Sequence, residues 1–282
     1  MKIIIPFLLI IIFQTNILGQ QIYAIDFMDK ISSSPKDKLE HFKLLSMDFV
    51  EKLDKSDVSE VDKVFVELLK VQTTIQNNYN THIYQLENYD EIETIIYSDK
   101  NLHTKAAKEF EKYVRENGFV IQTPEGMIFI EKDPAFLTQT FNEYLSENMR
   151  MFLRQYSSEI NEPFGEDGGI KISFELFGKR TLFWEQFESK NPDFILPDYA
   201  KNKYDFYLYH LISGMDNTPS FDWETKRLSN DYRESYETII NEFPNSKTSR
   251  ILTEFLDILK QNDFLNTIEV QGFIKKYNPY ND

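Results

Sequence analysis

Apolar residues recur at every third or fourth position along most of this chain of 282 residues. Leu39, Phe42, Leu45 and Phe49 show the spacing within one stretch. Because an α-helix completes a turn in about 3.6 residues, the spacing places these side chains on one helix face. Such faces are buried when helices pack against one another. The pattern therefore predicts a mainly α fold built from antiparallel helical hairpins.

The same spacing, read together with capping residues, predicts where the helices lie. We expect helices over 36–53, from Ser56 or Asp57 through Leu69, and over 80–97, 105–117, 134–159 with a kink near Ser146, 170–187, 198–213 and 247–261. Ser34-Pro35 and Asp133-Pro134 resemble helix starts, because proline suits the first helical position. Gly118 and Gly214 resemble helix ends, because glycine adopts the left-handed conformation found there.

One passage near the middle of the chain has the composition of strands. Phe119–Gln122 and Met127–Ile130 are β-rich runs that flank Thr-Pro-Glu-Gly, which suits a turn. We therefore predict a small β-hairpin near residues 119–130. A two-stranded hairpin is marginal in water by itself, so we expect it to pack against helices.

A weak internal repeat follows in the C-terminal half. Nine residues from Trp184 to Pro192 align with nine from Tyr236 to Pro244: each begins with an aromatic residue and glutamate, and each ends in proline. A helix, a proline-containing turn and a second helix form the unit of an α-solenoid. Two copies are fewer than the roughly three that a free-standing solenoid needs. The prediction is therefore of solenoid-like hairpins.

The N-terminus and the lack of cysteine indicate where the protein works. Lys2 precedes an apolar run, Ile3–Phe13, which is too short to span a membrane and is typical of a secretory signal peptide. We expect a signal peptide over 1–20 and an exported protein, periplasmic or extracellular, with no membrane span after cleavage. Cysteine is absent, so the protein is not predicted to be a lipoprotein and has no disulfides.

The predicted organisation after the signal peptide has two parts. An N-terminal helical region occupies 21–118, and the β-hairpin with a C-terminal helical domain occupies 119–282. One continuous domain over 21–282 is the alternative. The formal net charge of −15 repels phosphate backbones and anionic lipids, so we expect neither nucleic acid nor a membrane surface as a partner.

Four segments resemble a group of uncharacterised secreted bacterial proteins. They are EGMIFIEKDPAFL, FGEDGG, WEQFESKNP and GMDNTPSFD, and the resemblance covers roughly residues 119–258. It implies a bacterial origin and an ordered helical domain. It carries over no activity and no catalytic residues.

The segment 214–224, GMDNTPSFDWE, concentrates polar and aromatic side chains between two expected helices. Its residues suit a turn, since Asp216 or Asn217 can bond the backbone ahead of Pro219. The alternative is a cation site, although the alternating acids of an EF-hand loop are missing. The candidate cation ligands are Asp216, Asp222 and Glu224.

A second polar loop is expected at Asn161–Gly169, NEPFGEDGG. Glu162, Glu166 and Asp167 could bind a metal or another ligand there. A simpler interpretation is that Glu166 and Asp167 precede a helix and favour its positive N-terminus.

Aromatic residues are the remaining signal for a binding site. The helix expected over 198–213 carries five aromatic residues from Tyr199 to Tyr209, which is more than one face can bury. We therefore predict an aromatic-lined groove near segment 214–224. The residues expected to contact a partner are Asp216, Asn217, Asp222, Trp223, Glu224, Trp184 and Tyr207.

Catalytic motifs do not stand out. The histidines at 41, 82, 103 and 210 are scattered, and P-loop, nucleotide-binding and nucleophile-elbow motifs are absent, so no cofactor is predicted. We favour a binding or scaffolding module for an envelope protein, a peptide or a glycan over an enzyme. The alternative is a hydrolase of the cell envelope that uses paired carboxylates. Its candidates are Glu166, Asp167, Glu185, Asp216 and Asp222.

Overall fold

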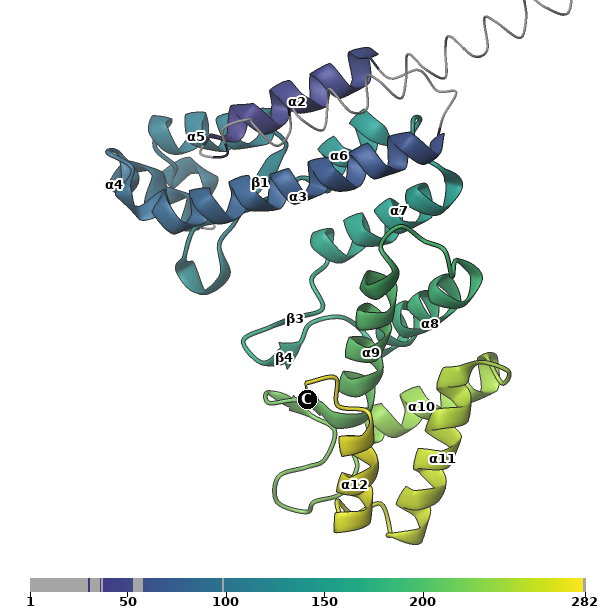
Figure 1. Cartoon of the computed structure of the whole chain (residues 1–282). Helices are drawn as coiled ribbons and strands as arrows, with labels where there is room; N and C mark the ends of the chain where they lie inside the picture. The colour runs from purple at the N-terminus through teal and green to yellow at the C-terminus, as the bar shows by residue number, and fades with distance from the viewer. Residues whose placement is uncertain (1–29, 31–35, 37, 53–57, 98, 281–282) are drawn as a thin grey trace, which may run out of the picture. The chain divides into compact units, whose positions relative to one another are not determined.

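A computed structural model describes residues 30, 36, 38–52, 58–97 and 99–280. The predicted signal peptide, the helix start at Ser34-Pro35 and the cap at Ser56 or Asp57 lie outside the described residues. The fold is mainly α with small antiparallel strand pairs, as the sequence predicts (Figure 1). Within the described ranges, no helix combines the length and apolarity that crossing a membrane requires.

The chain divides into two compact units, and each is described by itself. The N-terminal unit ends at Asn161 and the C-terminal unit begins at Glu162. This division lies later than the boundary predicted after residue 118. The difference arises because the β-hairpin packs on helices of the N-terminal unit.

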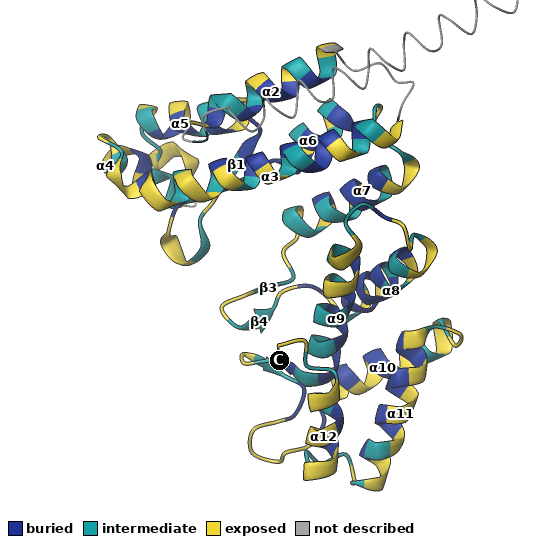
Figure 2. Cartoon of the chain, viewed as in Figure 1, coloured by how far each residue is buried: buried dark blue, intermediate teal, exposed yellow. Residues whose placement is uncertain are grey.

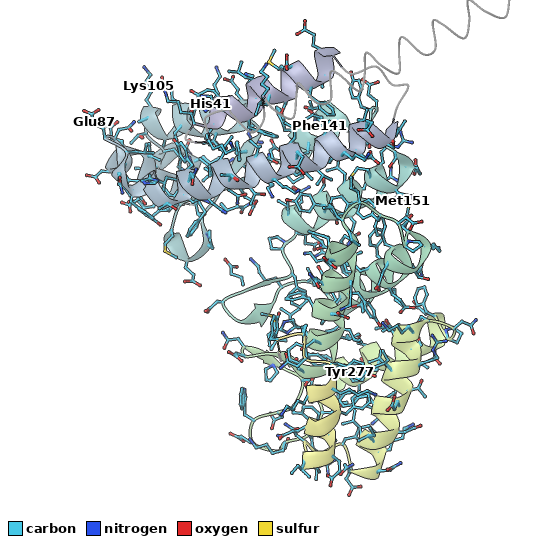
Figure 3. The ribbon with its side chains drawn as sticks, in the orientation of Figure 1. His41, Glu87, Lys105, Phe141, Met151 and Tyr277 are labelled. Atoms are coloured by element: carbon cyan, nitrogen blue, oxygen red, sulfur yellow. The ribbon has the colours of Figure 1, made fainter. Side chains whose placement is uncertain are left out.

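In the N-terminal unit, α3 (Val58–His82) is the long central helix, and α2 (Leu39–Lys52) packs along it. The other helices are α4 (Tyr89–Ile92), α5 (Lys105–Glu116), α6 (Pro134–Phe141) and α7 (Glu147–Asn161). Short 3-10 turns occupy Ile83–Gln85, Glu93–Ile96, Lys100–Leu102 and Pro124–Gly126. Phe141, labelled in Figure 3, lies in the core, where its ring centroid is 5.3 Å from that of Phe49 and 5.1 Å from that of Phe65.

The helix predicted over 80–97 is not a single helix. Buried Val71 and Ile75 continue the apolar stripe of α3 without a break, so α3 runs on to His82. Beyond it, Leu86 adopts an extended conformation and the chain forms short turns around α4. The caps predicted at Asp133 and Gly118 are confirmed. The Asp133 carboxylate accepts a hydrogen bond from Ala135 N at 2.8 Å, and Gly118 has φ +87°.

The predicted hairpin is present, with its second strand two residues later than expected. Strand β1 (Phe119–Gln122) pairs with β2 (Phe129–Lys132), with Phe119 opposite Lys132. Helix α3 holds this hairpin through two side-chain amides. Gln72 Nε2 donates to Gly118 O at 2.9 Å. Asn80 donates to Ile130 O at 2.9 Å and accepts from Ile130 N at 2.8 Å, as a neighbouring strand would.

The C-terminal unit is built from two successive helical hairpins. Helix α8 (Phe174–Lys190) packs on α9 (Pro197–Ser213), and α10 (Asn230–Glu242) packs on α11 (Lys247–Gln261). Helix α12 (Ile268–Lys276) then packs on α11 and α9. Helix α8 also contacts α10 and α11, which joins the two hairpins as in a helical repeat.

Aromatic residues dominate the core of the C-terminal unit, and buried residues follow stripes along its helices (Figure 2). Trp184, Tyr204, Tyr207, Tyr232 and Tyr236 are all fully buried. A buried hydroxyl needs a partner. Tyr236 Oη therefore donates to Leu211 O at 2.7 Å, and Tyr232 Oη donates to Thr218 O at 2.8 Å.

The paired amide of Asn80 leads to the first prediction. Asn80→Ala leaves both polar groups of Ile130 without their partner, which should lower the free energy of unfolding by about 1–3 kcal/mol. It should also speed hydrogen exchange at the Ile130 amide. Urea denaturation and exchange measured by NMR would test this.

Asn77→Ala is the matched control, because Asn77 lies on the exposed side of the same helix. Its effect should stay within about 0.5 kcal/mol. Equal losses in the two variants would show that Asn80 does not support the hairpin.

Candidate functional site

The two polar loops singled out in the sequence each form a very short strand pair. In the first, β3 (Gly165–Glu166) pairs with β4 (Gly169–Ile170). Asp167 and Gly168 make the turn with φ values of 48° and 67°. Two left-handed residues of this type form the tight hairpin turn for which Asp-Gly is a favoured sequence.

This hairpin corrects the interpretation of Glu166 and Asp167 as residues that precede a helix. Helix α8 begins only at Phe174, and Ser173 caps it by accepting a hydrogen bond from Leu176 N at 3.2 Å. The role at the helix N-terminus that was expected of Glu166 and Asp167 therefore belongs to Ser173. Both acids lie instead on the first hairpin.

The second strand pair occupies the start of segment 214–224. Strand β5 (Gly214–Met215) pairs with β6 (Thr218–Pro219), and Gly214 ends α9 as predicted. Gly214 has φ +74°, and a Cβ there would lie 2.4 Å from Ser220 N. No residue with a side chain fits this position without moving the backbone.

The structure brings the two hairpins side by side. Asn217 N donates to Gly168 O at 2.8 Å, and the Asn217 side-chain amide donates to Asp167 O. Ile170 N donates to Thr218 Oγ1 at 3.0 Å. Asn217 therefore joins two loops that the sequence analysis treated as separate sites, and the pair forms one small platform.

Phe164 fixes the first hairpin to the helices below it. Its ring centroid lies 5.0 Å from that of Phe177 on α8 and 5.2 Å from that of Phe206 on α9. The rings of Tyr207 and His210 lie 5.3 and 5.8 Å away. Aromatic contacts at these distances add to the area that the ring buries.

A cleft of about 330 Å³ opens where the platform meets the end of α9. It is lined by Gly168, Tyr209, His210, Ser213, Gly214, Met215, Asp216, Pro219 and Trp223. Trp223 is 67% exposed, and the Lys226 ammonium lies 5.9 Å from the centroid of its ring. The cleft thus combines aromatic rings, a carboxylate, a hydroxyl and an imidazole.

The turn that carries Trp223 is held by a carboxylate. Asp222 Oδ1 accepts hydrogen bonds from Thr225 N at 2.7 Å, Thr225 Oγ1 at 2.8 Å and Glu224 N at 3.1 Å. The bonds from Thr225 hold the pKa of Asp222 below its usual value. Asp222 therefore shapes the turn, and Glu224 is an exposed residue within it.

Metal binding is not supported at this turn. Among the residues that the structure describes, no three His, Asp or Glu side chains are grouped as metal ligands. The predicted cation ligands Asp216, Asp222 and Glu224 are among the described residues and form no such group.

Two of the predicted binding residues lie in the core and cannot reach a partner. Trp184 is 0% exposed and Tyr207 is 1% exposed. Helix α9 packs against both α8 and α12, so more than one of its faces is covered. Tyr209 is one of the five aromatic residues from which the groove was predicted, and it lines the cleft although it was not among the residues expected to contact a partner. Its position, with His210 and Ser213 in the last turn before Gly214, could have indicated it.

The carboxylates proposed for a hydrolase do not meet in this cleft. All five lie in the described part of the chain, and of these only Asp216 lines the cleft. Glu166 forms an ion pair with Lys171. Glu185 caps α11: its two oxygens accept hydrogen bonds from Lys247 N at 2.7 Å, Thr248 N at 2.8 Å and Thr248 Oγ1 at 2.6 Å.

His210 lines the cleft and has a defined tautomer. Its Nδ1 is 3.0 Å from Gly214 O. Because a carbonyl oxygen only accepts, Nδ1 carries the proton and Nε2 is the bare nitrogen of the neutral ring. Burial lowers the pKa of His210 from its ordinary value of 6.5, and the hydrogen bond to Gly214 opposes that change in part.

Comparison with known proteins gives no relative, since no match was found among protein-family models, curated proteins or solved structures. The resemblance to secreted bacterial proteins therefore stays a prediction.

The capping role of Glu185 can be tested by mutation. Glu185→Ala removes the acceptor for two backbone N–H groups of α11 and should lower the free energy of unfolding by about 1–2 kcal/mol. Glu188→Ala, on the same helix, should change it by no more than about 0.5 kcal/mol. Urea denaturation followed by circular dichroism measures both. Similar values would contradict the capping role.

The lowered pKa of His210 predicts a pH dependence. The folded state favours the neutral ring, so the unfolded state binds the proton more readily and stability falls as pH drops below 6.5. His210→Asn keeps a donor near Gly214 O but does not titrate. The wild-type protein should therefore lose more stability than this variant between about pH 7 and pH 5 in urea denaturation. Parallel pH profiles would contradict the prediction.

Proposed function

We propose that the protein is an exported binding or scaffolding module of the bacterial cell envelope or exterior. Its contact site is the cleft where the two loop hairpins meet. The observation that supports the proposal most is Trp223: a large aromatic side chain, mostly exposed, at the edge of a concave surface. Exposed tryptophan beside a cleft is typical of residues that contribute strongly to binding.

The rigidity of the cleft also supports binding. Three hydrogen bonds between the loops, the Asp222 cap and the Tyr232 hydroxyl hold its walls. A site that is ordered before the partner arrives loses less conformational entropy when the partner binds.

The partner is a protein, a peptide or a glycan, and the chemistry of the cleft favours a glycan. Its volume is at the lower end of the range for ligand pockets, so it holds a short part of a longer molecule. Trp223 and Tyr209 offer flat apolar faces to the C–H side of a sugar ring. Asp216 and Ser213 offer oxygen atoms to sugar hydroxyls.

The hydrolase alternative has weaker support. A carboxylate mechanism needs two acidic groups on opposite sides of the bond that breaks. Asp216 is the one proposed carboxylate in the cleft, and Glu185 already serves the N-terminus of α11.

The proposal is tested by removing the exposed groups of the cleft. Trp223→Ala should lower capture of partner material from the host envelope fraction by at least about tenfold, because the ring supplies the main contact surface. Asp216→Ala should lower it by a smaller factor. Immobilised protein incubated with labelled envelope material provides the measurement. Capture unchanged in both variants would exclude the cleft as the site.

Matched variants and two treatments complete the design. Ile268→Ala removes another exposed apolar side chain, and Asp193→Ala removes another exposed carboxylate, and neither residue lines the cleft. Both should capture as the wild type does. Periodate, which cleaves sugar diols, should abolish capture if the partner is a glycan, and protease should abolish it if the partner is a protein or peptide.

A further inference from the structure

A second concave surface lies on the C-terminal unit, between α8 and α10. The groove has a volume of about 250 Å³, and none of its lining residues belongs to the cleft described above. Helices α8 and α10 are the first helices of two successive hairpins. In helical repeat proteins, equivalent helices of neighbouring hairpins form the concave surface that takes a partner.

The floor of the groove is apolar. Phe174, Gly178 and Leu182 follow one another at intervals of four on α8, and Ile239 and Phe243 do so at the end of α10. A Cβ at position 178 would lie 3.0 Å from Ile239 Cδ1, so the glycine allows the two helices to approach closely. A glycine inside a helix is less favourable than alanine, and the close approach of the two helices offsets that cost.

The rim of the groove is acidic. Four carboxylates line it, from Glu175, Asp231, Glu234 and Glu242, and Lys179 is the one cation among the lining residues that the structure describes. Lys179 forms an ion pair with Glu175 on its own helix. The rim therefore carries an excess of negative charge next to an apolar floor.

We propose that this groove binds a cationic amphipathic segment of a partner polypeptide. An apolar side chain of the segment occupies the floor, and lysine or arginine residues on either side face the acidic rim. Complementary charge speeds encounter and selects the partner, while the apolar contact supplies affinity. A second copy of this chain is a poor occupant, because its net charge of −15 would be repelled by the acidic rim.

The proposal goes beyond the cleft around Trp223, and the two surfaces can be tested separately. The probe is a fluorescein-labelled synthetic peptide in which two leucines are flanked on each side by two lysines. One comparison peptide replaces the leucines with serine, and another replaces the lysines with glutamate. Fluorescence anisotropy with the full-length protein measures each dissociation constant.

The double variant Glu234→Lys/Glu242→Lys reverses two charges on the rim. It should weaken binding of the lysine–leucine peptide by at least about tenfold. The serine peptide should bind at least about tenfold more weakly to the wild type, and the glutamate peptide should not bind. Added salt should weaken binding, because the rim is exposed.

The matched control is Glu237→Lys/Glu254→Lys, which makes the same change in charge at two residues that do not line the groove. It and the cleft variant Trp223→Ala should bind the lysine–leucine peptide within about threefold of the wild type. An equal loss in the control would show a general effect of charge and overturn the proposal. Equal binding of the serine peptide, or no binding of the lysine–leucine peptide, would overturn it as well.

Discussion

The packing of aromatic residues between α8, α9 and α10 is the interaction on which the C-terminal unit depends. The chain has no cysteine, so no disulfide bond stabilises it. Trp184 and Tyr236 are fully buried, and such side chains remove large apolar areas from water. The tyrosine hydroxyls make this core specific as well as stable. A buried hydroxyl must find its acceptor, which restricts how the helices can be arranged.

This core extends directly into the candidate site. Tyr232 belongs to the buried cluster, yet its hydroxyl donates to Thr218 O in the second loop hairpin. Phe164 holds the first hairpin in place in a similar way, because its ring packs against α8 and α9. Asn217 then joins the hairpins to each other. The loops thus take their positions from the helical core, and Trp223 lies at the edge of the cleft in the turn that follows the second hairpin.

Local patterns predicted the parts of the fold that depend on local physics. The α11 range 247–261 was predicted in full, because the apolar spacing and the proline-containing turn before it are both local features. The caps at Asp133 and Gly118 were recognised for the same reason. By contrast, Trp184 and Tyr207 were predicted to contact a partner but are buried in the core. Spacing alone does not show how many faces of a helix are covered.

The candidate site could be predicted only in part. Segment 214–224 was singled out from its composition, and Asp216 and Trp223 do line a cleft. Its pairing with the hairpin around Asp167 joins residues about fifty positions apart, and no local pattern records such a contact. Asp167-Gly168 is a sequence that favours a tight hairpin turn. The hairpin was not predicted, because the acids of this segment were interpreted as residues that precede a helix.

The two concave surfaces of the C-terminal unit differ because the fold forms them in different ways. The cleft lies at the end of α9, where loops leave polar groups and Trp223 near the surface. The groove lies along the sides of α8 and α10, where the residues facing the seam are apolar and those beside it are charged. A stack of helical hairpins produces both kinds of surface, and the charge around each one determines which partner chemistry it can accept.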